Sequence, residues 1–367
     1  MEVGWKDQDA GGRDRPSGEG TLIGLGAALV PRVVNVAFVC AFMGVPAAAG
    51  GGHFVTTRDG VKVYYDAVGS GVPIVMIAGG PGSSSARFRY THSLLQPLGR
   101  LVYLDNRGRG RSEQARSREP AYSLDNDLLD VEAVRTHLGA ERIIIYGHSY
   151  GSMVALAYAS RFPTHTMALM TTAGIHGARV WQERNIDTVK RFIQYHMLER
   201  WRRIIELRSV GQLTGEGELA QLFDGMDELY TYNPESESRL HAQLADYNDP
   251  NAVVFNPDVY REMVGDDPEW KLGGTLKDVE LLPGLAEYKG PALIMGGRYD
   301  RICPPINQFE IAEALHNAKL VIFEHSGHAP FTEEPLLFLQ VVTEFLLKVV
   351  LSEDVPDVTL KGNHITR

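Results

Sequence analysis

The sequence has only two cysteines, Cys40 and Cys303, and neither belongs to a Cys-x-x-Cys or Cys/His spacing. Such spacings are typical of structural zinc sites, so the sequence predicts no metal, and it shows no cofactor motif either. Positive charge is also scarce, because 36 Lys and Arg stand against 46 Asp and Glu and leave a net charge of −10 at pH 7. Nucleic acids and anionic membranes attract cationic surfaces, so this balance argues against both as partners.

The sequence also lacks an apolar run long enough to span a bilayer, which needs about 20 residues. Its apolar run at residues 33–45 follows Arg32 and ends before a short stretch of small residues that begins at Pro46. This order matches a secretory signal peptide and predicts a secreted or periplasmic protein, with a cytoplasmic enzyme that carries a loose extension as the alternative. Because 32 residues precede the run, we hypothesise that translation starts near Val30 through a non-standard start codon.

After residue 52 the pattern becomes that of alternating strands and helices. Asp59-Gly60 lies between two short alternating segments and predicts a hairpin with a two-residue turn. Three apolar runs follow, rich in β-branched residues, as expected for strands buried on both faces: residues 74–78, 101–104 and 143–146. Apolar residues recur at helical spacing between Leu124 and Leu138. Strands that alternate with helices predict an α/β fold with a mostly parallel sheet flanked by helices.

The alternation stops at about residue 175 and resumes at about residue 289. The stretch between is charged and reads as helices with turns. We therefore predict one sheet domain, with its first part at 53–174 and its second at 289–351, interrupted by a helical cap at 175–288. Residues 1–52 read as a disordered extension with the signal-like segment, and 352–367 as a loose tail.

The strongest chemical signal is the pentapeptide GHSYG at residues 147–151, directly after a predicted strand and before a helical run. This is the G-x-S-x-G nucleophile elbow in the strand–turn–helix context that it requires. The turn holds the hydroxyl of Ser149 above the sheet at a helix N-terminus, where backbone N–H groups favour developing negative charge. The motif predicts Ser149 as a catalytic nucleophile.

A serine hydroxyl needs a base, and the base needs an acid that orients it. With this elbow the order along the chain is Ser, acid, His. Asp300 follows the predicted strand 293–296, and His328 follows the predicted strand 320–323. Both therefore lie at C-terminal strand ends, on the sheet edge where Ser149 emerges. The sequence predicts the catalytic set Ser149, Asp300 and His328.

Other acids and histidines lie near enough in the sequence to compete for these roles. His325 is only two residues past its strand and should not reach the serine, and His148 should point away from the serine hydroxyl. Glu324 lies on the wrong segment for the acid. Two further aspartates fall in or near the predicted cap and are expected to be solvated: Asp267 and Asp278.

The developing oxyanion needs backbone N–H donors. The glycine-rich loop 79–82 follows a predicted strand, at the point where this fold supplies one donor. We assign the donors to the N–H groups of Gly80 and Tyr150, with Gly79 as the alternative to Gly80.

The segment 105–112 alternates arginine and glycine after another predicted strand. A phosphate site is one reading, but no phosphate-binding glycine motif supports it. We instead expect Asp105 and Arg107 to pair and brace the loop.

Five motifs together resemble the proline iminopeptidase family of α/β-hydrolases. They are GGPG at 79–82, the segment 105–112, GHSYGS at 147–152, GGTLKD at 273–278 and GRYD at 297–300. The resemblance spans roughly residues 54–347. It implies an α/β-hydrolase fold, a helical cap over the site and cleavage of an N-terminal residue from small peptides or amides. It also implies the triad and oxyanion roles assigned above.

The chain departs from the family in three places. Ala78 stands where the family's oxyanion loop usually begins with histidine, Tyr150 stands where tryptophan often follows the serine, and the cap has no Trp-x-x-Trp-Glu segment. Glu183 and Glu262 are cap carboxylates that could receive a substrate ammonium.

The sequence therefore predicts a serine hydrolase without a cofactor, acting on a small peptide, amide or ester through an acyl-enzyme. An aminopeptidase of the proline iminopeptidase type is the first choice. An esterase or another small-molecule hydrolase is the alternative, and a non-catalytic binding protein on the same fold is a third possibility.

Overall fold

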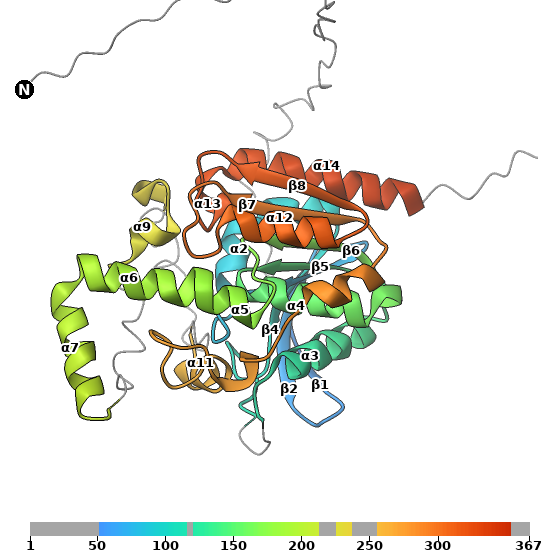
Figure 1. Cartoon of the computed structure of the whole chain (residues 1–367). Coiled ribbons are helices and arrows are strands. Elements are labelled where there is room, and N and C mark those ends of the chain that lie inside the picture. Colours follow the sequence, from blue (N-terminus) through green and yellow to red (C-terminus); the bar gives the residue numbers. More distant parts are fainter. Residues whose placement is uncertain (1–50, 116–119, 213–224, 237–254, 354–367) are drawn as a thin grey trace, which may run out of the picture. The chain divides into compact units, whose positions relative to one another are not determined.

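The computed structural model describes residues 51–115, 120–212, 225–236 and 255–353 (Figure 1). The signal-like segment at 33–45 with Cys40, and the tail from residue 354, lie outside the described residues. The predictions made for them therefore stay predictions.

One eight-stranded sheet organises the described residues, in the order β1-β2-β4-β3-β5-β6-β7-β8. β2 pairs antiparallel with β1 and with β4, and every pairing from β4 to β8 is parallel. The mostly parallel sheet predicted from the sequence is thus confirmed. The strands are β1 Gly51–Thr56, β2 Lys62–Val68, β3 Pro73–Ile77, β4 Arg100–Asp105, β5 Ile143–His148, β6 Thr166–Thr172, β7 Ala292–Gly297 and β8 Ala318–Phe323.

Both faces of the sheet are buried, because successive residues of a strand contribute to different cores. In β3, Ile74 and Met76 belong to one cluster, whereas Val75 and Ile77 belong to the other. Helices cover each face (Figure 1). The helices are α2 Ala86–His92, α3 Leu124–His137, α4 Tyr150–Arg161, α5 Ala178–Val180, α6 Asp187–His196, α7 Leu198–Ser209, α9 Asp227–Tyr230, α11 Pro257–Val264, α12 Pro305–Ala314, α13 Pro330–Glu333 and α14 Pro335–Glu353.

The first hairpin differs from its prediction. Thr57 and Val61 pair through their backbones and through the Thr57 hydroxyl, so three residues lie between them rather than the two of the predicted turn. The hydroxyl accepts from the Val61 N–H at 3.0 Å, which closes the wider loop. Gly60 lies within this loop at φ 89°. The longer loop carries Asp59 toward Arg107, which bonds its carboxylate at 2.8 Å.

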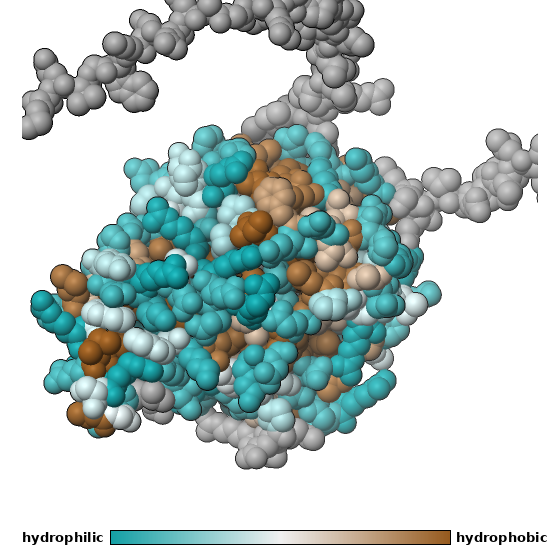
Figure 2. All heavy atoms as spheres, viewed as in Figure 1, coloured by the Kyte–Doolittle hydropathy of each residue, from teal (hydrophilic) through white to brown (hydrophobic). Residues whose placement is uncertain are grey.

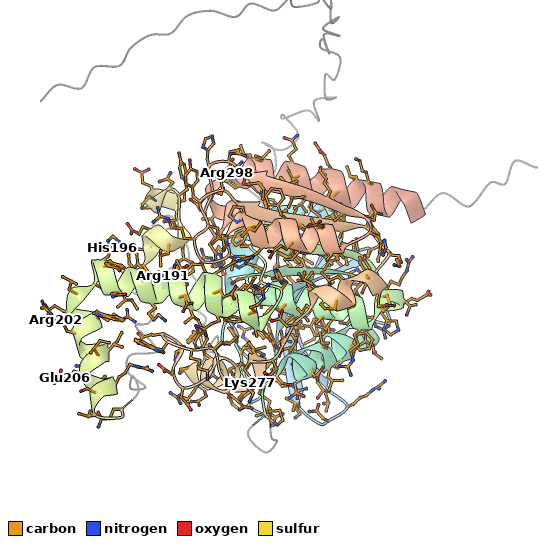
Figure 3. The ribbon with its side chains drawn as sticks, viewed as in Figure 1. Arg191, His196, Arg202, Glu206, Lys277 and Arg298 are labelled. Atoms are coloured by element: carbon orange, nitrogen blue, oxygen red, sulfur yellow. The ribbon has the colours of Figure 1, made fainter. Side chains whose placement is uncertain are left out.

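Between β6 and β7 the described residues form helices, turns and two isolated bridges, with no strand of the sheet. The helices of this stretch include α6 and α7, which are separated by a break at Met197. Val189, Phe192 and Ile193 form the buried side of α6. Charged side chains project outward from both helices, such as Arg191 on α6 and Arg202 on α7 (Figure 3). The face seen in Figure 2 is accordingly hydrophilic over most of its area.

Of the helices in the described ranges, none combines the length and the apolar character that a membrane crossing requires.

Candidate active site

Ser149 occupies a sharp turn between β5 and α4. Its φ of 54° and ψ of −120° lie in a region that non-glycine residues rarely adopt. The Ser149 N–H donates to the carbonyl of Thr172 at 3.0 Å, which ties the turn to the end of β6. The strained backbone is what a nucleophile elbow requires, because it turns the side chain out of the strand before the helix begins.

The two glycines of the motif are required by close backbone approach. A Cβ on Gly147 would stand 2.0 Å from the carbonyl oxygen of Gly151. A Cβ on Gly151 would stand 2.2 Å from the carbonyl oxygen of Ile77, at the end of β3. The elbow is therefore packed directly against the strand that leads into the glycine loop.

Asp300 and His328 meet at the same edge of the sheet. The Oδ2 of Asp300 lies 2.8 Å from the Nδ1 of His328, and the two residues are 2% and 7% exposed. The Oδ1 of Asp300 accepts from the N–H groups of Ile302 and Cys303 at 2.9 and 2.8 Å. A carboxylate that faces Nδ1 holds the proton on that nitrogen and leaves Nε2 to act as the base.

Cys303 lies beside this site, where the sequence analysis did not place it. Burial raises the pKa of its thiol well above the ordinary value, and the neighbouring Ser149 hydroxyl offsets part of this rise. The described contacts include no hydrogen bond between Ser149 and His328. The sequence feature that could have indicated this placement is the position of Cys303, three residues after the predicted acid Asp300.

Asp300, Cys303 and His328 each offer a ligand atom, and these atoms lie within 4.8 Å of one another. They are the one group of this kind among the described residues. Because Asp300 and His328 are already hydrogen-bonded to each other, we interpret the group as a hydrolytic pair with a neighbouring thiol.

The competing histidines have other partners. The Nε2 of His148 lies 3.0 Å from the backbone oxygen of His328, and burial lowers the His148 pKa well below its ordinary value. A carbonyl only accepts, so the neutral His148 donates Nε2–H to the loop that carries His328. The His325 ring lies 5.7 Å from that of Tyr232, and Glu324 pairs with Arg298.

The glycine loop lies beside the serine. A Cβ on Gly79 would stand 2.9 Å from the Cβ of Ser149, and Gly80 adopts a φ of 61°. Tyr150 is the first residue of α4, and the first N–H groups of a helix have no partner within it. The two predicted donors thus come from segments that flank Ser149.

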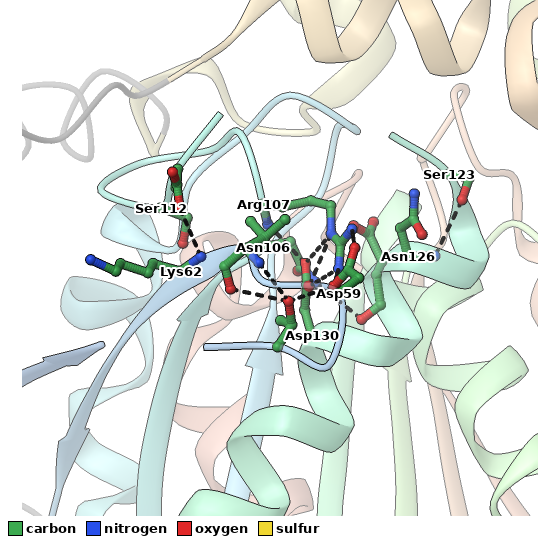
Figure 4. Close-up of polar contacts among 12 residues, drawn as sticks. Asp59, Lys62, Asn106, Arg107, Ser112, Ser123, Asn126 and Asp130 are labelled. Carbon is green, nitrogen blue, oxygen red and sulfur yellow. Dashed lines mark hydrogen bonds and ion pairs between the residues drawn. The ribbon is translucent and has the colours of Figure 1, made fainter. Parts of the chain in front are cut away.

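The arginine loop corrects one prediction, because Arg107 does not pair with Asp105. Arg107 bonds Asp130 on α3 at 2.7 Å and Asp59 at 2.8 Å, as Figure 4 shows. Asp105 instead accepts from the N–H and hydroxyl of Ser85 and from the Arg111 N–H. Burial alone would lower the pKa of Arg107, but the hydrogen bonds and charges of its two aspartates raise it overall.

Arg109 connects this loop to the elbow and to the glycine loop. It bonds both carboxylate oxygens of Asp127, at 2.6 and 3.0 Å, and donates to the Pro81 carbonyl. The Tyr150 hydroxyl donates to the same Asp127 at 2.6 Å. The Arg109 guanidinium is paired with Asp127, and its side chain is 3% exposed. It therefore supports the loops of the site and does not present a free cation to phosphate.

Comparison with known proteins identifies the family. The family model for the alpha/beta hydrolase fold matches residues 72–335. The chain belongs to the α/β-hydrolase family. A proline iminopeptidase of Saccharolobus solfataricus is 26% identical over 304 residues, which span 79% of this chain and 90% of that protein. The AB hydrolase superfamily protein YclE of Bacillus subtilis is 29% identical over 296 residues, which span 78% and 96%.

A solved structure agrees with the sequence comparisons. The proline iminopeptidase of Mycobacterium smegmatis aligns with a TM-score of 0.65 at 21% identity, over 83% of this chain and all of that structure. At this identity the match shows the fold. Together with the curated relatives, it confirms that this α/β-hydrolase is proline iminopeptidase-like.

The two cap carboxylates predicted to receive an ammonium have other contacts in this α/β-hydrolase. Glu183 is 53% exposed and pairs with Arg179 at 2.9 Å, and Glu262 accepts from the Tyr122 N–H at 2.8 Å. Neither is hydrogen-bonded to Ser149, Asp300 or His328 in the described structure. The roles assigned to them stay predictions.

Glu269 is a buried carboxylate of the same region that the sequence did not single out. It is 3% exposed and pairs with Arg200 at 2.7 Å. Burial raises the pKa of Tyr260, and the charge of Glu269 raises it further. Burial likewise raises the pKa of Tyr230 well above its ordinary value, and Tyr260, Cys303 and Asp300 add to this effect.

Proposed function

We propose that this hydrolase cleaves an amide or ester through an acyl-enzyme formed on Ser149. The observation that carries the proposal is the 2.8 Å contact between buried Asp300 and His328, on the edge where the strained Ser149 turn emerges. A buried acid–histidine pair beside a serine elbow is the arrangement that hydrolysis by a serine nucleophile needs.

In this reaction His328 removes the Ser149 proton as the hydroxyl attacks the substrate carbonyl, and later delivers it to the leaving group. Asp300 orients the imidazole and stabilises its cation. Water then attacks the acyl-enzyme, with His328 again as the base. The first step needs a hydrogen bond between the Ser149 hydroxyl and His328, and such bonds often form only in the substrate complex.

The N–H groups of Gly80 and Tyr150 are our candidates for the oxyanion donors, with Gly79 as the alternative. They support the proposal because they flank the serine from two backbone segments. Donors fixed by the backbone need no reorganisation as negative charge develops, and losing one typically slows such enzymes by about 100- to 1000-fold.

An aminopeptidase acting on small peptides is the substrate class we favour. It is supported by the name of the Saccharolobus solfataricus relative and by the motif resemblance. Such an enzyme needs an anionic group for the substrate's terminal ammonium. Glu269 is a third candidate beside Glu183 and Glu262, because it is the most buried of the three.

Two assays test this function. A fluorophosphonate probe should label the wild-type protein and leave Ser149→Ala unlabelled, whereas a non-catalytic binding protein would not react. Turnover of an amino-acid anilide should then exceed that of an acyl nitrophenyl ester that lacks a free amine. Faster ester turnover with no requirement for the amine would favour the alternative, an esterase.

Glutamine variants of the three cap carboxylates show which of them receives the substrate ammonium. The variant that removes the ammonium acceptor, which we expect to be Glu269→Gln, should raise KM for the anilide about 10-fold while leaving ester turnover unchanged. Glu183→Gln and Glu262→Gln serve as the matched controls. If the KM of all three variants equals that of the wild type, none of these three carboxylates is the ammonium acceptor.

A further inference from the structure

Glu333, at the end of α13, binds two separate parts of the chain with one carboxylate. Its Oε2 accepts from the N–H groups of Tyr232 and Asn233, both at 2.8 Å. Its Oε1 accepts from the N–H of Gly327 at 2.7 Å. The first pair belongs to the region between β6 and β7, and Gly327 directly precedes His328.

The part of the chain that Glu333 holds also contacts the loops of both predicted catalytic groups. We call residues 229–233 the clamp segment. The N–H of His328 donates to the Tyr230 carbonyl at 2.6 Å, and the N–H of Arg301 donates to the Leu229 carbonyl at 3.1 Å. The clamp segment therefore bridges the acid loop and the base loop.

Side-chain packing adds to this bridge. The ring of Tyr230 meets that of His328 edge to face, with centroids 5.3 Å apart. A Cβ on Gly327 would stand 2.1 Å from the Tyr230 carbonyl oxygen, so the two backbones are in direct contact. The imidazole is thus supported on one side by a residue that does not belong to its own loop.

We propose that Glu333 is a positioning residue, which fastens the clamp segment to the histidine loop and thereby holds His328 in place to act as the base. Three N–H donors converge on one carboxylate, and charge-assisted bonds of this kind are about twice as strong as neutral ones. Without the carboxylate, the described contacts that still join the clamp segment to the two loops are two backbone hydrogen bonds and ring contacts of Tyr230 and Tyr232. This inference rests on the proposed function, because it takes His328 as the base.

The neighbouring Glu334 provides a matched control. Its Oε2 accepts from the His325 N–H at 3.0 Å and from the Ser326 hydroxyl at 2.6 Å. It therefore holds the same histidine loop but forms no described hydrogen bond with the clamp segment. Glu333→Ala and Glu334→Ala remove equal charge from adjacent positions and differ in the segment released.

Hydrogen exchange tests the fastening without using catalysis. In Glu333→Ala, the amides of Tyr232, Asn233 and His328 should all exchange at least about 10-fold faster than in the wild type. In Glu334→Ala, the amide of His325 should exchange faster, while those of Tyr232, Asn233 and Gly327, which are bonded to Glu333, keep the wild-type rate. Unchanged exchange at Tyr232 and Asn233 in Glu333→Ala would overturn the proposal.

Kinetics test the consequence for the base. Glu333→Ala should lower the rate of fluorophosphonate labelling and kcat by about 10- to 100-fold with a smaller change in KM, since a misplaced group acts on the chemical step. Glu333→Gln keeps one carbonyl oxygen to accept and should be intermediate, and it replaces the alanine variant if that variant does not fold. An equal loss in Glu334→Ala, or no loss in either Glu333 variant, would overturn the proposal.

The two tests separate the positioning role from the proposed function. If the wild-type protein itself fails to react with the fluorophosphonate, the proposed function is wrong. The exchange rates at Tyr232, Asn233 and His328 still decide whether Glu333 fastens the clamp segment.

Discussion

Two regions at the same edge of the sheet carry charge in different ways. The loop after β4 holds Arg107 and Arg109, whose guanidinium groups are buried and bonded to aspartates of α3. The loops after β5, β7 and β8 hold Ser149, Asp300 and His328, with one acid–histidine contact. Both regions are polar and enclosed, but the first is built from arginine–aspartate pairs and the second from an acid–histidine contact beside a serine.

The difference shows what the paired charges contribute. A buried ion pair in which every carboxylate oxygen is engaged holds separate backbone segments in place. Arg109 holds the glycine loop through Pro81 and the elbow through Asp127 and Tyr150. We infer that the first region supports the second, so substitutions in the two regions should have different effects.

The largest expected effect is on activity alone. Ser149→Ala should lower kcat by about 10⁴-fold or more, because it removes the proposed nucleophile. Its unfolding free energy should stay close to that of the wild type, since no described ion pair is removed. Steady-state kinetics and urea unfolding measure both quantities. Activity within 10-fold of the wild type would show that another residue is the nucleophile.

The reverse pattern is expected for the supporting region. Arg107→Met leaves Asp59 and the fully buried Asp130 without their cation, and should lower the unfolding free energy by about 3–5 kcal/mol. Urea unfolding measures the loss, and adding Asp130→Asn should recover part of it. Arg298→Met, which breaks an exposed pair with Glu324, is the control and should unfold like the wild type. Equal stability of the two single variants would contradict the comparison.

The smallest effect concerns a partly exposed pair and its pH dependence. The hydrogen bond from Arg184 lowers the pKa of Glu310 to about 2, from an ordinary value near 4.5. A depressed carboxyl pKa stabilises the fold above the unfolded value and loses this contribution as pH falls from about 4.5 to about 2. Because the side chain is 28% exposed, we expect about 2 kcal/mol, less than the shift alone implies.

Glu310→Gln tests this by urea unfolding at several pH values. The variant should lose the contribution at pH 7 and show a flatter decline in stability between pH 4.5 and 2 than the wild type. Parallel declines in the two proteins would assign the acid sensitivity to other carboxyls.

Much of the fold and the meeting of Asp300 with His328 could be predicted, because strand periodicity places the residue after each parallel strand at a common edge. The partners of Arg107 could not be predicted from its own loop, since Asp130 lies 23 residues away on a helix. A signal was nevertheless present. Asp127 and Asp130 lie among the apolar positions of that helix, where a carboxylate is expected only with a cationic partner.

Two other features depended on packing that periodicity does not describe. The contact of Cys303 with Ser149 follows from the turn after Asp300, whose carboxylate captures two consecutive N–H groups. The hairpin turn is longer than predicted because Thr57 closes the loop with its own hydroxyl. Both are local side-chain bonds to the backbone, which compete with the regular patterns read from the sequence.

The contact of Gly151 with the end of β3 bears on how this enzyme would be re-engineered. The serine turn and the glycine loop meet through main-chain atoms with no space for a methyl group. Random mutagenesis at these positions should therefore yield mostly inactive clones whatever the substrate. A library aimed at new selectivity has room on the exposed sides of α6 and α7, which make none of the described hydrogen bonds to Ser149, Asp300 or His328.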